Sequence, residues 1–146
     1  MAGAYKRPES VLVVVYTRRG DVLMLQRVAP ADYWQSVTGS LRWGESPVEA
    51  ACRELAEETG LQAHDTLVDC RRRNTFPIVP PWRARYAPEA VTNTEHVFSI
   101  EFPRRPPIRL NPREHCALRW LQRDAAARLA SSYTNRDAII ECVPAL

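Results

Sequence analysis

The chain has 146 residues and no long apolar run. The longest, Val11 to Tyr16, is far shorter than the roughly 20 residues that a helix needs to span a bilayer. Lys6 and Arg7 are followed only by this short run, which does not resemble a signal peptide. We therefore expect a cytoplasmic protein that does not enter membranes. Its length and ordinary apolar fraction of 45% predict one globular domain over residues 1–146.

The chain also lacks the cysteine spacing of a zinc site or a disulfide framework. Its four cysteines are widely scattered, with no C-x-x-C and no histidine pair nearby at zinc spacing: Cys52, Cys70, Cys116 and Cys142. Free cysteine is among the residue types most often buried. We expect reduced and mostly buried side chains.

Lysine is almost absent, because 19 of the 20 basic residues are arginine and only Lys6 is lysine. The net charge is a mild +3, and the arginines are dispersed rather than gathered in a basic arm. This pattern does not favour nucleic acid, whereas a phosphorylated small molecule suits it. The single lysine is either a dedicated phosphate ligand or an ordinary surface residue.

Strand signals surround one strong helix signal. The sequence predicts a hairpin of residues 11–16 and 22–27, and a short extended piece at 36–38 that Gly39 ends. Residues 71–88, rich in arginine and proline, suggest a long loop or irregular strand. Further strands are expected at 66–70, 96–102, 108–110 and 117–121, and further helices at 124–129 and from Thr134 or Asn135 to Cys142. A mixed sheet packed against helices follows, which is an α/β fold.

The strong helix signal begins at Ser46, a candidate N-cap. Pro47 suits the first helical position, Glu49 completes a capping box, and Gly60 is expected to end the helix after Thr59. Helical periodicity predicts a stripe facing the core: Val48, Ala51, Cys52, Leu55 and Thr59. Three glutamates share a neighbouring face of this helix.

Glu54, Glu57 and Glu58 stand at i, i+3 and i+4, where like charges repel. Hard oxygen ligands crowded on one face suit Mg²⁺ or Mn²⁺. The alternative is a solvated helix face. Arg53 is placed to orient one of these carboxylates, or else makes an ordinary surface ion pair.

These residues belong to a longer pattern, in which Gly39 and Glu45 precede Arg53 to Leu61 (RELAEETGL). The pattern resembles the Nudix box, G-x5-E-x7-R-E-U-x-E-E-x-G-U with U aliphatic, at every specified position. The resemblance implies a Nudix fold, with a mixed sheet between helices (an α/β/α sandwich), and a Mg²⁺-dependent hydrolase acting on phosphoric anhydrides. It makes Glu54, Glu57 and Glu58 metal ligands.

A fourth carboxylate from outside the helix often assists in this family. Glu114, in the polar loop Asn111 to His115, is the best candidate, with an exposed loop acid as the alternative. The expected catalytic residues are Arg53, Glu57 and Glu114. Either Glu57 or Glu114 accepts the proton from water, because coupled carboxylates around a metal prevent a single assignment.

Other stretches are similar to one bacterial branch of the family, whose members remove pyrophosphate from dihydroneopterin triphosphate in folate biosynthesis. They are Tyr5–Pro8, Leu23–Arg27, Trp34–Ser40, Arg85–Pro88 and Asn93–Glu95. The resemblance implies substrate contacts from Lys6, Arg27, Thr38 and Ser132, and a wall for the pterin ring from Phe76, Pro77, Ile78 and Val79. Trp34 is either a ring-stacking residue or part of the core.

Two alternatives remain at this point. The first is a broader nucleoside triphosphate pyrophosphohydrolase acting on dATP or oxidised nucleotides, since one scaffold can carry many pockets. The second is a non-catalytic Nudix-fold module that senses a phosphorylated ligand. Pro77 and the basic run Arg71 to Arg73 depart from the branch pattern, which leaves the ring selectivity open.

Overall fold

A computed structural model describes residues 5–145. The strands, helices and one short 3₁₀ helix follow one another along the chain as β1 Glu9–Thr17, β2 Asp21–Arg27, β3 Trp34–Gln35, β4 Val37–Ser40, α1 Pro47–Thr59, β5 Val68–Pro77, η2 Arg83–Arg85, β6 Thr92–Phe102, β7 His115–Gln122, α2 Arg123–Leu129 and α3 Tyr133–Cys142.

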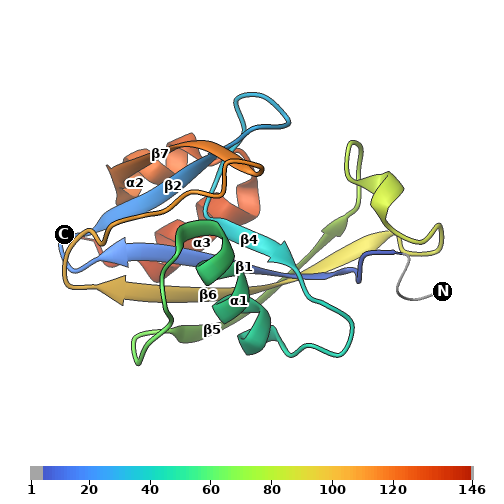
Figure 1. Cartoon of the computed structure of the whole chain (residues 1–146), viewed down its shortest axis with the longest axis horizontal. Helices are drawn as coiled ribbons and strands as arrows, with labels where there is room; N and C mark the ends of the chain where they lie inside the picture. Colours follow the sequence, from blue (N-terminus) through green and yellow to red (C-terminus); the bar gives the residue numbers. More distant parts are fainter. Residues whose placement is uncertain (1–4, 146) are drawn as a thin grey trace.

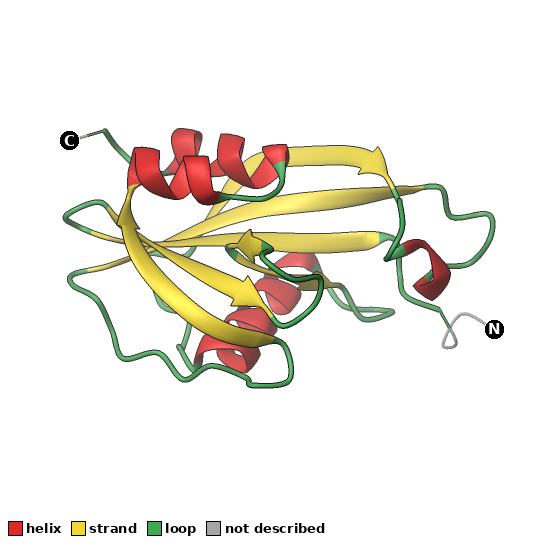
Figure 2. Ribbon diagram, turned by 90° about the horizontal axis from the view of Figure 1, so that it is seen from above, coloured by secondary structure: helices red, strands yellow, loops and turns green. Residues whose placement is uncertain are grey.

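The strands form one mixed sheet with helices on both faces (Figure 1, Figure 2). β1 runs parallel to β6, and the other pairings are antiparallel. On its other edge, the first half of β1 pairs with β4, and the end of β1 pairs with β2. Strand β2 in turn pairs with β7. The expected α/β sandwich is confirmed.

The side chains of β1 alternate between two cores, because successive residues of a strand point to opposite faces. Val11 and Val13 pack with Leu55 on the α1 side. Leu12 and Val14 pack with Ile139 on the side of α2 and α3. A sheet buried on both faces explains why β1 is an almost unbroken apolar run. Among residues 5–145, no helix is long and apolar enough to cross a membrane.

Helix α1 begins and ends as its sequence indicates. The Ser46 hydroxyl accepts from the Glu49 N–H, the Glu49 carboxylate accepts from the Ser46 N–H, and Gly60 adopts a left-handed φ of 77°. The predicted stripe is wrong at two positions: Val48 is 51% exposed and Cys52 only partly buried. Ala50, Ala51, Leu55 and Thr59 face inward, together with Glu54 and Glu58. The acids themselves occupy the inner face because a cavity lies there.

Two other expectations need correction, and a third is decided between its two alternatives. Residues 108–110 form no strand, because Ile108 and Leu110 pack against the α1-side core and the Arg109 N–H donates to the Thr59 carbonyl. Residues 71–77 are the irregular strand rather than the loop: they form the second part of β5, which pairs with β6 after an irregularity between Asp69 and Arg72. Gly39 does not end an extended piece but lies within β4.

The ends of the molecule differ in detail from the expectations. Ser132, not Thr134 or Asn135, caps α3, since its hydroxyl accepts from the Asn135 N–H. All four cysteines are free, as expected, but none is fully buried and Cys116 is exposed. Cys116 faces outward because it alternates with the buried His115 at the start of β7.

Candidate functional site

A cavity of about 660 Å³ lies where the first turn of α3 and the inner face of α1 approach the sheet. The walls contain eleven residues that the sequence predicted for the site: Lys6, Arg27, Thr38, Glu54, Glu58, Phe76, Pro77, Ile78, Val79, Glu114 and Ser132. These residues are far apart in the sequence. The fold therefore brings carboxylates, cationic groups and an apolar wall into one space of the size that small-molecule sites have.

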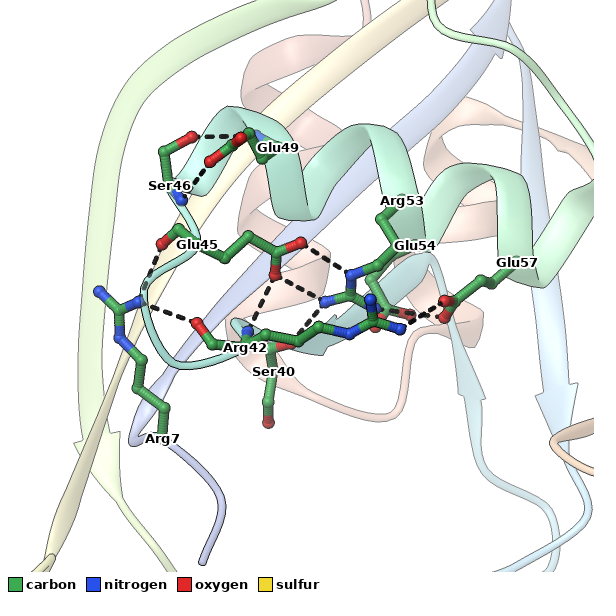
Figure 3. A network of polar contacts seen from close by, with 9 residues as sticks. All are labelled: Arg7, Ser40, Arg42, Glu45, Ser46, Glu49, Arg53, Glu54 and Glu57. Atoms are coloured by element: carbon green, nitrogen blue, oxygen red, sulfur yellow. Dashed lines mark hydrogen bonds and ion pairs between the residues drawn. The ribbon is translucent and has the colours of Figure 1, made fainter. Parts of the chain in front are cut away.

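Arg53 does not line the cavity but organises the residues behind it (Figure 3). Its guanidinium donates to both carboxylate oxygens of Glu45 at 2.8 Å, and to Glu54 Oε1 at 2.8 Å. It also donates to the Ser40 carbonyl at 3.0 Å. The hydrogen bonds from Arg53 lower the pKa of Glu45 to about 2, and this carboxylate in turn raises the pKa of Arg53. A bidentate pair with little exposure holds the loop before α1 against the helix.

Gly39 makes room for Glu54. A Cβ at residue 39 would lie 2.2 Å from Glu54 Cδ and 2.3 Å from its Oε1. No side chain tolerates such distances, so the Glu54 carboxylate occupies the volume that any other residue at position 39 would fill. The glycine that the Nudix box specifies is required at this position by packing against Glu54 and not by unusual backbone angles.

Glu58 lies deepest of the acids, with 1% of its surface exposed. Burial is the main reason that its pKa is raised well above the usual value, and the neighbouring Glu54 and Glu114 raise it further. The nearby Thr38 backbone lowers the pKa, but Glu58 Oε1 has no hydrogen-bond partner among residues 5–145. A buried, unpartnered carboxylate oxygen beside two other acids is unfavourable unless a cation joins them.

The carboxylates of Glu58 and Glu114 and the imidazole of His115 offer ligand atoms that all lie within 4.8 Å of one another. His115 is buried, and burial together with nearby Arg27 lowers its pKa to about 4. The ring is thus neutral at pH 7, and its 3.9 Å approach to Glu58 Oε1 is not an ion pair. This donor set and the orphaned oxygen fit a divalent cation. Glu58, Glu114 and His115 could hold it, and Glu54, which neighbours Glu58 in the cavity wall, could add a further carboxylate.

Glu57 lies outside this group. Its carboxylate is 44% exposed and pairs with Arg53 at 3.2 Å and Arg42 at 3.3 Å, and it does not line the cavity. Glu114 does line it. Glu114 is an exposed residue, but partial desolvation of its carboxyl group and the negative charge of Glu54 raise its pKa.

The cationic groups enter the cavity from the N-terminal segment and from β2. Lys6 is held by its backbone N–H, which donates to the Arg85 carbonyl at 3.0 Å. Burial is the main cause that lowers the pKa of Lys6, followed by the positive charge of Arg85. Arg27 and Arg85 line the same space. Crowded like charges favour an anionic ligand, and the single lysine lies in the cavity wall among them.

The opposite wall is apolar. Phe76 and Ile78 line the cavity, and the Ile78 N–H donates to the Val91 carbonyl at 2.9 Å, which fixes the end of β5. Tyr33 and Trp82 add an edge-to-face aromatic pair with centroids 5.7 Å apart. Trp34 packs against the core on the side of α2 and α3 and does not line the cavity.

Two predicted hydroxyl contacts have structural partners as well. The Thr38 hydroxyl donates to the Val11 carbonyl at 2.8 Å, and the Ser132 hydroxyl caps α3 while lying in the cavity wall. Sequence reasoning missed seven buried polar side chains in the wall: Ser10, Gln35, Asn93, Glu95, His115, Thr134 and Asn135. A signal existed for two of them: Asn93 and Glu95 are spaced by two residues from each other and from Val97, and this spacing places all three on one face of a strand.

Comparison with known proteins agrees with this geometry. Residues 6–141 match the NUDIX domain family. The chain is 46% identical over 145 residues to a dihydroneopterin triphosphate diphosphatase of Escherichia coli K12, covering 95% of this chain and 94% of that protein. It is 39% identical over 139 residues to a Haemophilus influenzae protein of the same name, covering 92% and 87%.

The solved structure of the E. coli dihydroneopterin triphosphate pyrophosphohydrolase superposes with a TM-score of 0.89 at 44% identity, over 96% of this chain and 97% of that one. The predicted family and fold are confirmed by these matches. A cavity lined by the box acids Glu54 and Glu58, a family match over residues 6–141 and a superposition of this quality lead to one conclusion: the protein belongs to the Nudix hydrolase family.

Proposed function

We propose that the protein hydrolyses dihydroneopterin triphosphate to dihydroneopterin monophosphate and pyrophosphate, a step of folate biosynthesis, with Mg²⁺ as cofactor. One observation carries the proposal: a single cavity joins a group of acids, a group of cations and an apolar wall, in a chain 46% identical to a dihydroneopterin triphosphate diphosphatase. An aromatic heterocycle carrying a triphosphate needs these three surfaces together.

The proposed roles follow the geometry. Glu54, Glu58 and Glu114 hold the divalent cation, which, when bound, neutralises phosphate charge and lowers the pKa of water. Arg53 fixes the Glu54 carboxylate through its 2.8 Å hydrogen bond. Lys6 and Arg27 bind phosphate oxygens.

The reaction adds water to one phosphorus of the α–β anhydride, and the bond between that phosphorus and the bridging oxygen breaks. We propose Glu114 as the group that accepts the proton of the attacking water, because its carboxylate lines the cavity while Glu57 pairs with two arginines outside it. The role of Glu57 as a metal ligand or base stays a prediction. So do the single domain over residues 1–146 and the cytoplasmic location.

The test is pyrophosphate release from dihydroneopterin triphosphate, dATP and an oxidised nucleoside triphosphate at equal Mg²⁺ or Mn²⁺. We expect kcat/KM to be highest for the pterin, and loss of the activity in Glu54→Gln. Glu101→Gln, at the far end of β6, is the control that should keep full activity. A dNTP turned over equally well or better would favour the nucleotide alternative, and ligand binding without any release would favour a sensor.

A further inference from the structure

Asn93 and Glu95 begin strand β6 and point to the same face of the sheet, since they are two residues apart. They are 4% and 6% exposed, and both line the cavity. They lie on the face that carries α3, on the wall opposite the acids of α1. Neither residue has a part in the metal or phosphate groups described above. A buried amide and a buried carboxylate there need another explanation.

Asn93 presents an acceptor without a partner. Its Nδ2 donates to the Ser10 hydroxyl at 2.8 Å, and its Oδ1 is buried with no hydrogen-bond partner in the described part of the chain, residues 5–145. Buried side-chain oxygens are almost always paired in folded proteins. An unpaired one in a cavity wall indicates a position where a ligand N–H completes the hydrogen bonding.

Glu95 presents a second acceptor, held by neutral groups only. Asn74 Nδ2 donates to Glu95 Oε1 at 3.2 Å, and the nearby Thr134 hydroxyl is a second donor, which lowers the pKa of this carboxylate. The Asn74 amide is oriented by Arg72, whose Nε donates to Asn74 Oδ1 at 3.2 Å. Two donors leave free part of the roughly four lone-pair sites of a carboxylate. Burial raises the pKa of Glu95, because the donors around it do not compensate fully for the lost contact of its charged form with water.

The neighbours of this pair suit a flat ring. In the β5–β6 register Phe76 stands opposite Asn93, and Asn74 stands opposite Glu95. Residues directly opposite in an antiparallel pair share a face, so the aromatic ring of Phe76 lies beside the two acceptors. A heterocycle packed on Phe76 thus presents its edge, not its face, to Asn93 and Glu95.

We infer that Asn93 and Glu95 form the subsite that selects the base: they bind the adjacent N–H groups of a 2-amino-4-oxopyrimidine ring, as in a pterin or a guanine. The inference rests on the proposed function and adds its specificity. A carboxylate accepts from an amino group and the neighbouring ring N–H together, in the same bidentate manner as it accepts from a guanidinium. Adenine presents an unprotonated ring nitrogen beside its amino group, and that nitrogen would face the carboxylate unpaired.

The experiment compares kcat/KM for dihydroneopterin triphosphate, GTP and ITP, because ITP differs from GTP only in lacking the 2-amino group. In the wild-type protein we expect GTP to exceed ITP by at least about tenfold, the loss expected when a buried acceptor stays unpaired. Glu95→Gln should lower kcat/KM for dihydroneopterin triphosphate by about 10–100-fold and bring the GTP to ITP ratio close to one. Asn93→Leu should reduce the ratio less, since it removes a neutral acceptor.

Glu101→Gln is the matched control, because Glu101 lies on the same strand and outside the cavity. It should leave the ratio and the melting temperature unchanged. Equal rates for GTP and ITP in the wild type would overturn the inference, and this result does not depend on whether any variant folds. A folded Glu95→Gln protein with an unaltered ratio would overturn it too.

The two proposals fail separately. If dihydroneopterin triphosphate is not hydrolysed but the GTP to ITP ratio is high and depends on Glu95, the proposed function is wrong and the edge recognition stands. If the pterin is hydrolysed and the ratio is one, the recognition is wrong and the function stands.

Discussion

Gly39→Ala tests the site through a single methyl group. The new Cβ would lie 2.2 Å from Glu54 Cδ, so the carboxylate must move by about 1.2 Å to reach ordinary contact at 3.4 Å. Such a move breaks the 2.8 Å hydrogen bond from Arg53 and takes Glu54 out of line with Glu58. Misplacing a reacting or ligating group by about 1 Å can cost about 100-fold in rate, and we expect kcat/KM to fall by about that factor.

Overpacking of this kind also lowers the free energy of unfolding, by about 1–3 kcal/mol. For a chain of this size the melting temperature should drop by about 2–4 °C for each kcal/mol. The assay is pyrophosphate release over a range of Mg²⁺ concentrations, with thermal unfolding followed in parallel. The half-saturating Mg²⁺ concentration should rise, because one ligand of the proposed metal site is displaced.

Gly44→Ala is the matched control. Gly44 has a left-handed φ of 84°, yet no atom lies within 4 Å of its added Cβ. Alanine there costs about 1–2 kcal/mol of backbone strain without touching Glu54. The control should thus lose stability and keep its activity. Full activity in Gly39→Ala, or an equal loss of activity in both variants, would show that Gly39 does not act through the Glu54 carboxylate.

Three further predictions test other parts of the site. Glu58→Gln should lower kcat by at least about 10³-fold and yet raise the melting temperature in EDTA by a few degrees, because it removes a carboxyl group whose charged form is disfavoured by burial and by its acidic neighbours. A less stable variant would contradict this. Lys6→Ala should raise KM by about tenfold with little change in kcat, and an unchanged KM would return Lys6 to the ordinary surface. The pKa of Glu45 is lowered from 4.5 to about 2, so its contribution to stability is complete above pH 4.5 and is lost as the pH falls through 2. After allowance for solvent screening, we expect the free energy of unfolding to fall by about 1–2 kcal/mol on this account between pH 6 and pH 2. Urea unfolding should show that Glu45→Gln lacks this part of the pH dependence. Parallel plots of the free energy of unfolding against pH for the two proteins would refute the prediction.

The local signals in the sequence were reliable where they depended on neighbouring residues. The capping box at Ser46, the left-handed Gly60 and the approach of Arg53 to Glu54 follow from spacing along one helix, and the structure contains all three. The stripe of α1 was misplaced because helical periodicity identifies apolar residues. It does not reveal that two carboxylates, Glu54 and Glu58, are buried together with them.

Strand assignments depended on distant partners and were less reliable. Residues 108–110 alternate like a strand, but no neighbouring chain pairs with them, and they cover α1 instead. The composition of the basic segment from Arg71 left a loop and an irregular strand open, and the segment extends β5 because β6 offers a free edge. Which segments pair is decided by what else lies within reach, and composition alone does not contain that information.

By itself the sequence determined the family, the acids of α1 and most of the residues that line the cavity, because the box is a local pattern on one helix with its preceding loop. Only the tertiary structure decided that Gly39 makes room for Glu54, that Glu57 pairs outside the cavity, and that Asn93 and Glu95 are buried in its wall. The physical reason is that burial, and the lack of a hydrogen-bond partner for a polar atom, depend on how the helices and strands pack around the cavity. That space exists only when β1, β5, β6, α1 and α3 have packed together.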